Sequence, residues 1–268
     1  MTCFCVAFYA LTVPCFSQPA KIESALHAPF RSKIDEPYLR QGFRCIGRQA
    51  WDEAAQQFDH CKQLDLLNIT QLTKVVWTYT DAGEHVKALP LAVLLVERVK
   101  SSKEPLTDDQ KADAYQCRVV CYEATREWAK AAEDYQILIR LRPSKAFHWS
   151  DSAGRCYLRL GKLAQASAMF DNAMALQKND PVLMFHKAQC LDAQSRWSEA
   201  IVILNASVNL CMAERRKMPD AHSQFYADLL KERVRCNTKL GQYAKANSDK
   251  RTLTELDSAW ADSLFGGK

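Results

Sequence analysis

The chain has 268 residues, of which 48% are hydrophobic and 25% charged, and its formal net charge at pH 7 is +5. These fractions are ordinary for a globular protein and exclude an intrinsically disordered chain or a polytopic membrane protein. The charge is too small for this length to indicate a nucleic-acid partner. Only 8 residues are glycine, and neither GxGxxG nor GxxxxGK[ST] occurs, which excludes the common phosphate-cradling enzymes.

The chain begins with an apolar segment, Phe4–Phe16, which is 13 residues long. That length is too short to span a bilayer and suits the hydrophobic region of a secretory signal peptide. Cys15 and Ser17 are small residues at the −3 and −1 positions of a cleavage after Ser17. We expect residues 1–17 to be a cleaved leader of a periplasmic or secreted protein. Because no Lys or Arg precedes the segment, the alternative is an apolar tail or a misassigned start on a cytoplasmic protein.

From Trp51 onward one short pattern recurs six times, with a bulky residue followed three positions later by alanine. The successive bulky residues are 34, 43, 35, 34 and 46 positions apart. A period near 34 residues is typical of stacked helix pairs, which bury an apolar core only by stacking. Alanine at the pattern's fixed position would let two helices approach closely. The six pairs are Trp51/Ala54, His85/Ala88, Trp128/Ala131, Leu163/Ala166, Trp197/Ala200 and Tyr243/Ala246.

Turn and strand signals agree with a helical repeat. Gly83, Gly161 and Gly241 each stand two residues before a bulky residue, where a left-handed residue would end the preceding helix. Strand signals are nearly absent, since the apolar run 91–99 lies inside a helical period. We therefore expect about twelve helices.

The pattern resembles the tetratricopeptide repeat, a helix–turn–helix unit. The fourth segment carries the fullest match: Gly154, Tyr157, Gly161, Leu163, Ala166, Phe170 and Ala173. The resemblance implies an all-α fold, a right-handed superhelical solenoid of such repeats. It places a linker at residues 18–34 and a repeat domain at 35–268 that ends in a C-terminal capping helix. The expected repeats lie near 35–68, 69–102, 112–145, 147–180, 181–214 and 227–260.

Two repeats depart from the family pattern. Pro90 falls inside the second helix of the second repeat and is expected to kink that helix or to shift its start. In the sixth repeat Asn237 replaces an aromatic residue, and Lys250 stands where a core ring is expected.

In this family the first helices of the repeats line a concave surface that binds peptides or proteins. Phe43 and Trp77 would then be apolar anchors. The five cations of the later repeats would make that part basic and suit an acidic partner, unless they are simply solvated. The candidate binding residues are Phe43, Trp77, Gln116, Arg155, Arg159, Phe185, Gln189, Lys231, Arg235 and Lys239; further inward positions are Leu39, Thr73, Val120 and Asp151.

No catalytic motif is present, and we expect neither a cofactor nor a metal ion. The nearest catalytic pair is His148 with Asp151, three residues apart on one helical face. Cys117 and Cys121 could share a helix face but make only half of a zinc site, so we expect the cysteines to pack as small apolar residues. Some members of this family bind the C-terminal carboxylate of a chaperone with Lys and Asn at inward positions of the first two repeats. The comparable positions here hold Leu39, Phe43 and Lys74, with no matching Asn, which disfavours that function.

The predicted function is therefore a non-catalytic scaffold that binds a peptide or partner protein in the groove. The alternative is a structural subunit of an envelope or secretion complex. Such a subunit would dock through its convex face or through an apolar stripe on the last helix. The stripe consists of Leu253, Leu256, Trp260 and Leu264.

Overall fold

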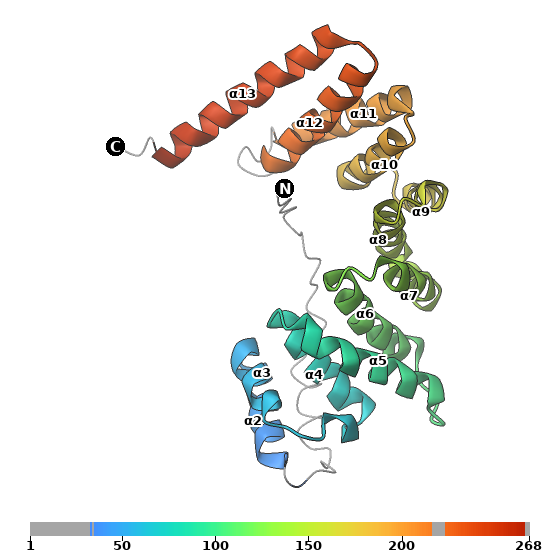
Figure 1. Cartoon of the computed structure of the whole chain (residues 1–268), viewed down its shortest axis with the longest axis vertical. Coiled ribbons are helices and arrows are strands. Elements are labelled where there is room, and N and C mark those ends of the chain that lie inside the picture. Colours follow the sequence, from blue (N-terminus) through green and yellow to red (C-terminus); the bar gives the residue numbers. More distant parts are fainter. Residues whose placement is uncertain (1–32, 34, 216–222, 266–268) are drawn as a thin grey trace. The chain divides into compact units, whose positions relative to one another are not determined.

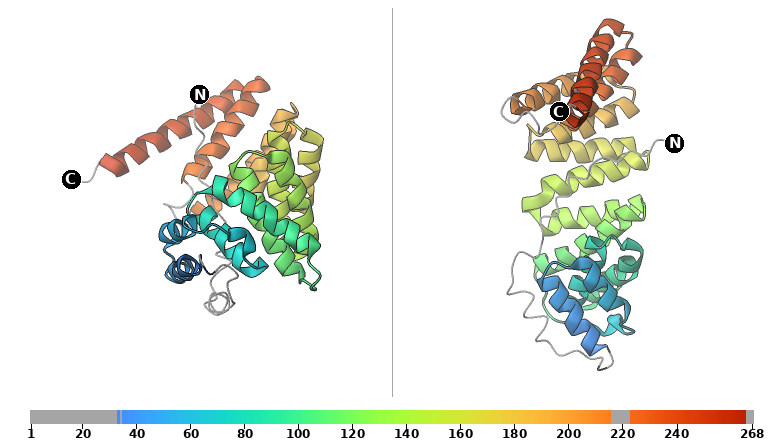
Figure 2. Two further views of the ribbon diagram at one scale, coloured as in Figure 1. Left: turned by 60° about the horizontal axis from the view of Figure 1, so that its bottom comes forward. Right: turned by 90° about the vertical axis from the view of Figure 1, so that its left-hand side faces the viewer.

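The structure, a computed structural model, describes residue 33 and residues 35–215 and 223–265. The expected leader lies outside the described residues, as does nearly all of the expected linker. The described part contains twelve α-helices and two short 3-10 helices and has no strand (Figures 1 and 2). The prediction of an all-α fold of helical repeats is confirmed.

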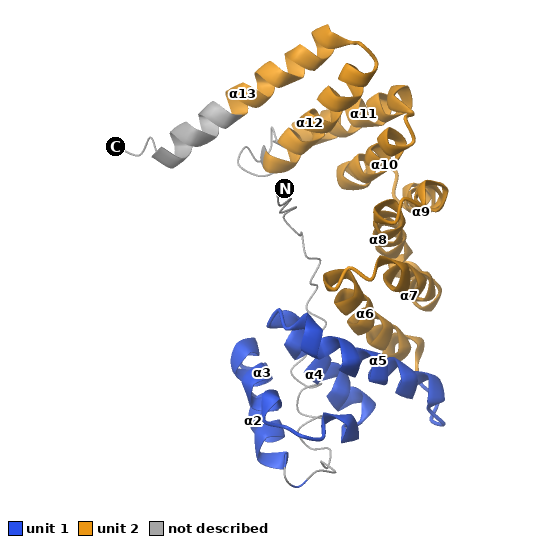
Figure 3. Cartoon of the chain, viewed as in Figure 1, with its two compact units in different colours: residues 1–106 blue, residues 107–268 orange. Residues whose placement is uncertain are grey.

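The chain divides into two compact units, residues 1–106 and 107–268 (Figure 3). The first unit holds two helix pairs, α2 (Glu36–Gly47) with α3 (Trp51–Asp59) and α4 (Ile69–Asp81) with α5 (His85–Ser101). The second unit holds four pairs, which follow each other in chain order. They are α6 (Asp108–Ala124) with α7 (Trp128–Leu141), α8 (Ala146–Arg159) with α9 (Leu163–Leu176), α10 (Pro181–Ala193) with α11 (Trp197–Arg215), and α12 (Ser223–Lys239) with α13 (Tyr243–Phe265).

Every second helix begins at the bulky residue of the sequence pattern. The alanine three residues later is at most 1% exposed in all six pairs. A methyl group at this point lets the two helices of a pair pack closely, whereas a larger side chain would separate them. α5 also begins at the patterned residue and continues through Pro90 to Ser101, so the proline does not shift its start. α6 and α12 each begin four residues before the expected repeat boundaries.

The turn inside each pair has one left-handed residue, two positions before the second helix. Gly83, Gly161 and Gly241 have φ values of 78°, 70° and 71°, as the sequence predicts. In the other three repeats Gln49, Arg126 and Ser195 adopt φ values of 59°, 63° and 60°. A residue with a Cβ atom is strained in this region, so these three turns store energy that glycine would not.

The core of a pair depends on complementary sizes at two facing positions. Gly154 of α8 lies against the ring of Phe170 of α9, and a Cβ atom on this glycine would be 2.6 Å from Cε1 of that ring. Gly42 faces Phe58 in the same register in the first unit. In the fifth repeat the same two positions hold Ala188 and Leu204, both fully buried. In these three repeats a glycine on the first helix faces a buried ring and an alanine faces a leucine, whereas the third repeat buries both Val119 and Tyr135 at these positions.

Candidate partner-binding surface

In the second unit the first helices of the last three repeats lie next to each other. α8 contacts α10, and α10 contacts α12. Figure 1 shows α6, α8 and α10 on one side of this stack and α7 and α9 on the other. We call the side chains on α6, α8, α10 and α12 that are at least partly exposed the first-helix surface. It contains Gln116, Val120, Asp151, Arg155, Arg159, Phe185, His186, Gln189, Lys231, Arg235 and Lys239.

Asp151 links α8 to α10. Its carboxylate lies 2.8 Å from Nδ1 of His186 on the next repeat and 3.5 Å from Nε of Arg155. Burial alone would lower the pKa of Arg155, but the nearby carboxylates of Asp151 and Glu123 raise it, so this residue stays charged. His148 does not pair with Asp151; its ring lies beside that of Phe147, with centroids 4.7 Å apart. The catalytic pair considered from the sequence is therefore not formed.

Asp192 links α10 to α12. Arg235 lies 2.7 Å from this carboxylate and 2.6 Å from the carboxylate of Glu232. Burial raises the pKa of Glu232, and Arg235 opposes that shift. Among the described residues, Asp192, Glu232 and Cys236 form the group with a metal-binding spacing. Burial raises the pKa of the Cys236 thiol to about 12, and both carboxylates pair with Arg235, so the three groups form part of an ion-pair cluster around this arginine.

Most of the predicted cations of the first-helix surface lie near acidic side chains. Arg155 and Arg235 are paired with carboxylates, and Lys231 lies 3.3 Å from Asp228. Arg159 is exposed, with its guanidinium carbon 4.7 Å from the centre of the Trp128 ring. Lys239 is exposed and forms no ion pair with a described residue. Acidic side chains of neighbouring turns and repeats thus pair with three of the five cations, and the basic character of the binding surface stays a prediction.

The predicted apolar anchors of the first unit also need correction. Phe43 is fully buried and packs edge-on against Phe58 at 5.4 Å, and Leu39 is 1% exposed. These two residues belong to the core of the first repeat. Trp77 is only partly exposed on α4. The position of a residue in the repeat pattern does not show whether its side chain lies on the binding surface or in the core. In a terminal repeat that depends on which other side chains pack around it.

An aromatic pair that the sequence analysis missed lies in the second unit. Phe185 of α10 and Phe225 of α12 meet edge to face, with ring centres 5.7 Å apart, and both are partly exposed. They join two neighbouring first helices and pack against the core of the last two repeats. Phe225 is not one of the inward positions that the repeat alignment gives. Its place on the surface is visible only from its contact with Phe185 of the preceding repeat.

The cysteines behave as the sequence predicts. Seven of the eight between residues 45 and 236 are buried, and Cys61 is intermediate. Burial is the main cause that raises the pKa of Cys121 and Cys156 to about 12. These thiols therefore fill space between helices as neutral groups.

Neither a protein-family model nor a curated protein sequence matches the chain. Several solved structures are similar to this chain. MamA 41-end from Desulfovibrio magneticus RS-1 superposes with a TM-score of 0.58 at 12% identity and covers 71% of this chain and 96% of its own. A tetratricopeptide repeat protein from Parabacteroides merdae superposes with a TM-score of 0.58 at 16% identity, and the match covers 84% of this chain and 80% of that chain. This chain has the fold of a tetratricopeptide-repeat protein.

A third structure supports this assignment. A putative kinesin light chain with nearly identical TPR-like repeats from Podosopora anserina gives a TM-score of 0.55 at 14% identity, covering 71% of this chain and 95% of that one. Since all three identities are low, the likeness shows a shared tetratricopeptide-type fold. Within its described residues, this chain has no helix that combines the length and apolarity needed to cross a bilayer.

Proposed function

We propose that this protein is a non-catalytic scaffold that binds a peptide or a partner protein on the first-helix surface of its second unit. The tetratricopeptide-type fold supports this, because stacked helix pairs present an extended surface without any catalytic machinery. The observation that carries the proposal is the chain of contacts between successive first helices. His186 with Asp151 and Arg235 with Asp192 hold partly exposed side chains of three repeats in fixed positions.

The chemistry of this surface defines the partner that we propose. Phe185 and Phe225 offer a partly exposed aromatic contact, the kind of group that dominates binding energy at interfaces. The charges around them are mixed, since Arg235 is balanced by Asp192 and Glu232. A segment with an apolar residue flanked by charges of both signs fits this surface better than a purely acidic one. We expect binding to weaken only slightly as ionic strength rises, because paired charges attract a partner weakly.

Position-specific photo-crosslinking tests this proposal. A photoreactive amino acid replaces Gln116 or Gln189 on the first helices, and in matched controls it replaces Leu176 or Val202 on the second helices. The proposal predicts that one partner is captured from the first-helix positions in the native host and not from the control positions. Capture only from the control positions would refute it. Substituting Glu for Arg155 is a poor test, because it would place a second carboxylate beside that of Asp151 in a partly buried site.

The alternative function is a structural subunit that docks through the second helices. Leu176, Val202 and Tyr243 are 60%, 69% and 63% exposed at the surface of α9, α11 and α13. Leu253 and Leu256 of the expected apolar stripe pack against the core of the last two repeats, while the side chains of Trp260 and Leu264 lie outside the described residues. Crosslinks from Val202 alone would favour this alternative.

Export is a separate proposal that rests on the N-terminal sequence. Measuring the intact mass of the protein from its native host tests it. Loss of residues 1–17 would support a periplasmic or secreted scaffold, whereas an intact chain would place the scaffold in the cytoplasm.

A further inference from the structure

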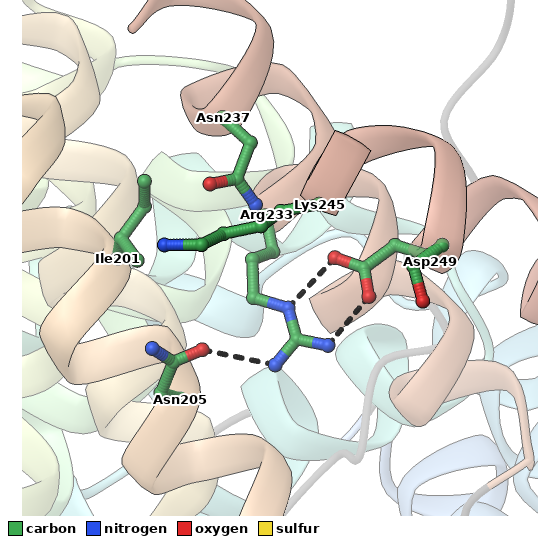
Figure 4. A pocket seen from close by; sticks show the side chains of 7 residues that line it. Ile201, Asn205, Arg233, Asn237, Lys245 and Asp249 are labelled. Atoms are coloured by element: carbon green, nitrogen blue, oxygen red, sulfur yellow. Dashed lines mark hydrogen bonds and ion pairs between the residues drawn. The ribbon is translucent and has the colours of Figure 1, made fainter. Parts of the chain in front are cut away.

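A cleft of about 290 Å³ lies in the sixth repeat, among α11, α12 and α13. Its walls include Asn205 of α11, Arg233 and Asn237 of α12, and Lys245 of α13 (Figure 4). Of these residues only Arg233, which is partly exposed on α12, also belongs to the first-helix surface. The cleft therefore calls for its own explanation.

Two other repeats show how a tyrosine can fill this space. Six residues before the second helix, the second, third and fourth repeats have Tyr79, Tyr122 and Tyr157, whereas the sixth has Asn237. The first and fifth repeats have Cys45 and Leu191 at the same position. The hydroxyl of Tyr79 donates to Asp59 at 3.0 Å, and the amide of Gln136 donates to the hydroxyl of Tyr157. In both cases the tyrosine reaches from a first helix to the second helix of the preceding repeat.

The sixth repeat keeps the polar partner of this contact but has lost the ring. Asp59 and Gln136 stand eight residues after the start of their helices, and Asn205 stands at that position in α11. Asn237 is too short to reach across as a tyrosine does. The cleft thus lies where a tyrosine ring and its hydroxyl are found in two other repeats.

The walls of the cleft are fixed, and one of their polar groups lacks a partner. Arg233 is held by two bonds to Asp249, at 2.8 and 2.6 Å, and by Oδ1 of Asn205 at 3.0 Å, as Figure 4 shows. Its planar guanidinium is therefore positioned to stack on an aromatic ring. Asn237 is 2% exposed, and its Oδ1 atom accepts no hydrogen bond from a described residue. A buried acceptor without a donor is destabilising, and a ligand that donates a hydrogen bond would remove that cost.

We propose that this cleft binds a phenol ring, namely an unmodified tyrosine side chain of a partner peptide. The ring lies against the guanidinium of Arg233, and the hydroxyl donates to Oδ1 of Asn237. The tyrosine of the partner thus takes the place of the tyrosine that the sixth repeat lacks. This site shares only Arg233 with the first-helix surface, and neither proposal needs the other.

Ligand-observed NMR on the full chain tests the proposal with p-cresol, the side-chain analogue of tyrosine, and with toluene, which lacks the hydroxyl. We expect saturation transfer to p-cresol and an affinity about fivefold higher than that of toluene, the factor that one ordinary hydrogen bond contributes. Asn237→Leu should make the two probes equal, because it removes the acceptor and keeps the volume. Asn237→Tyr should abolish both signals by filling the cleft.

Glu133→Tyr is the matched control, because it adds the same side chain to an exposed position of α7, outside the cleft and outside the first-helix surface, and should leave binding unchanged. Equal affinity for toluene and p-cresol in the unmodified protein would overturn the proposal, as would p-cresol binding that persists in Asn237→Tyr. If Asn237→Tyr does not fold, as judged by circular dichroism, the Asn237→Leu comparison still decides. The probes need no natural partner, so this test can fail while the first-helix proposal stands.

Discussion

The contact between Gly154 and Phe170 makes a quantitative prediction about how closely the two helices of a repeat pack. A Cβ atom at position 154 would lie 2.6, 2.8 and 2.9 Å from three atoms of a fully buried ring. Carbon atoms normally pack at about 3.5–4.0 Å, so the ring or the helix must move by about 1 Å. Such overpacking costs about 1–3 kcal/mol, and the higher helix propensity of alanine returns about 1 kcal/mol. We expect Gly154→Ala to destabilise the protein by up to about 2 kcal/mol, the difference between these two effects.

Urea denaturation measures this change as a shift of the midpoint at constant slope. The control is Gly47→Ala, where a Cβ atom would meet nothing within 4 Å, so alanine should be neutral or stabilising. The decisive comparison places Gly154→Ala in a Phe170→Leu background. That combination reproduces the Ala188 and Leu204 pair of the fifth repeat. There the same substitution should stabilise by up to about 1 kcal/mol, since the clash is gone. If Gly154→Ala has the same effect in both backgrounds, the packing argument is refuted.

Three further predictions follow from the turns, the ion pairs and the thiols. Arg126→Gly should stabilise by up to about 1 kcal/mol in thermal denaturation, because Arg126 has a φ of 63°; a loss of stability would contradict the strain argument. Asp134→Ala should cost about 3–5 kcal/mol in urea denaturation, because it leaves the guanidinium of Arg118 buried without its carboxylate; a loss below about 1 kcal/mol would show that the pair contributes little. The raised pKa of about 12 for Cys121 means that the folded state keeps a proton that the unfolded chain releases above about pH 9. This thiol should therefore not affect the unfolding free energy below about pH 9 and should lower it between about pH 9 and 12. Cys121→Ala should reduce the slope of the unfolding free energy against pH in that range. An identical slope in the variant would refute the raised pKa of Cys121.

Local steric rules explain what the sequence predicts correctly. The start of each second helix and the buried alanine follow from a contact that recurs six times, so the pattern is visible without any structure. The three turn glycines are predictable because few other residues adopt a positive φ. Gln49, Arg126 and Ser195 could not be found in this way, since nothing in their chemistry favours the left-handed region.

The charges and anchors of the surface depend on contacts between repeats, which is why they were harder to predict. Arg235 has the same position in its helix whether or not Asp192 of the preceding repeat reaches it. The burial of Phe43 has a different cause, a contact inside its own repeat with the ring of Phe58 on the facing helix, which the alignment of first helices alone does not reveal. Asn237 was recognised as a departure from the pattern, but only the geometry shows that its small size opens a cleft.

The central claim, that a partner binds across the first helices of the second unit, is tested most directly by hydrogen exchange of the protein with and without the crosslinked partner. The account predicts slower amide exchange in α6, α8, α10 and α12 when the partner is bound, centred on the segment around Phe185 and Phe225. Protection confined to α9, α11 and α13, with the first helices unchanged, would contradict it.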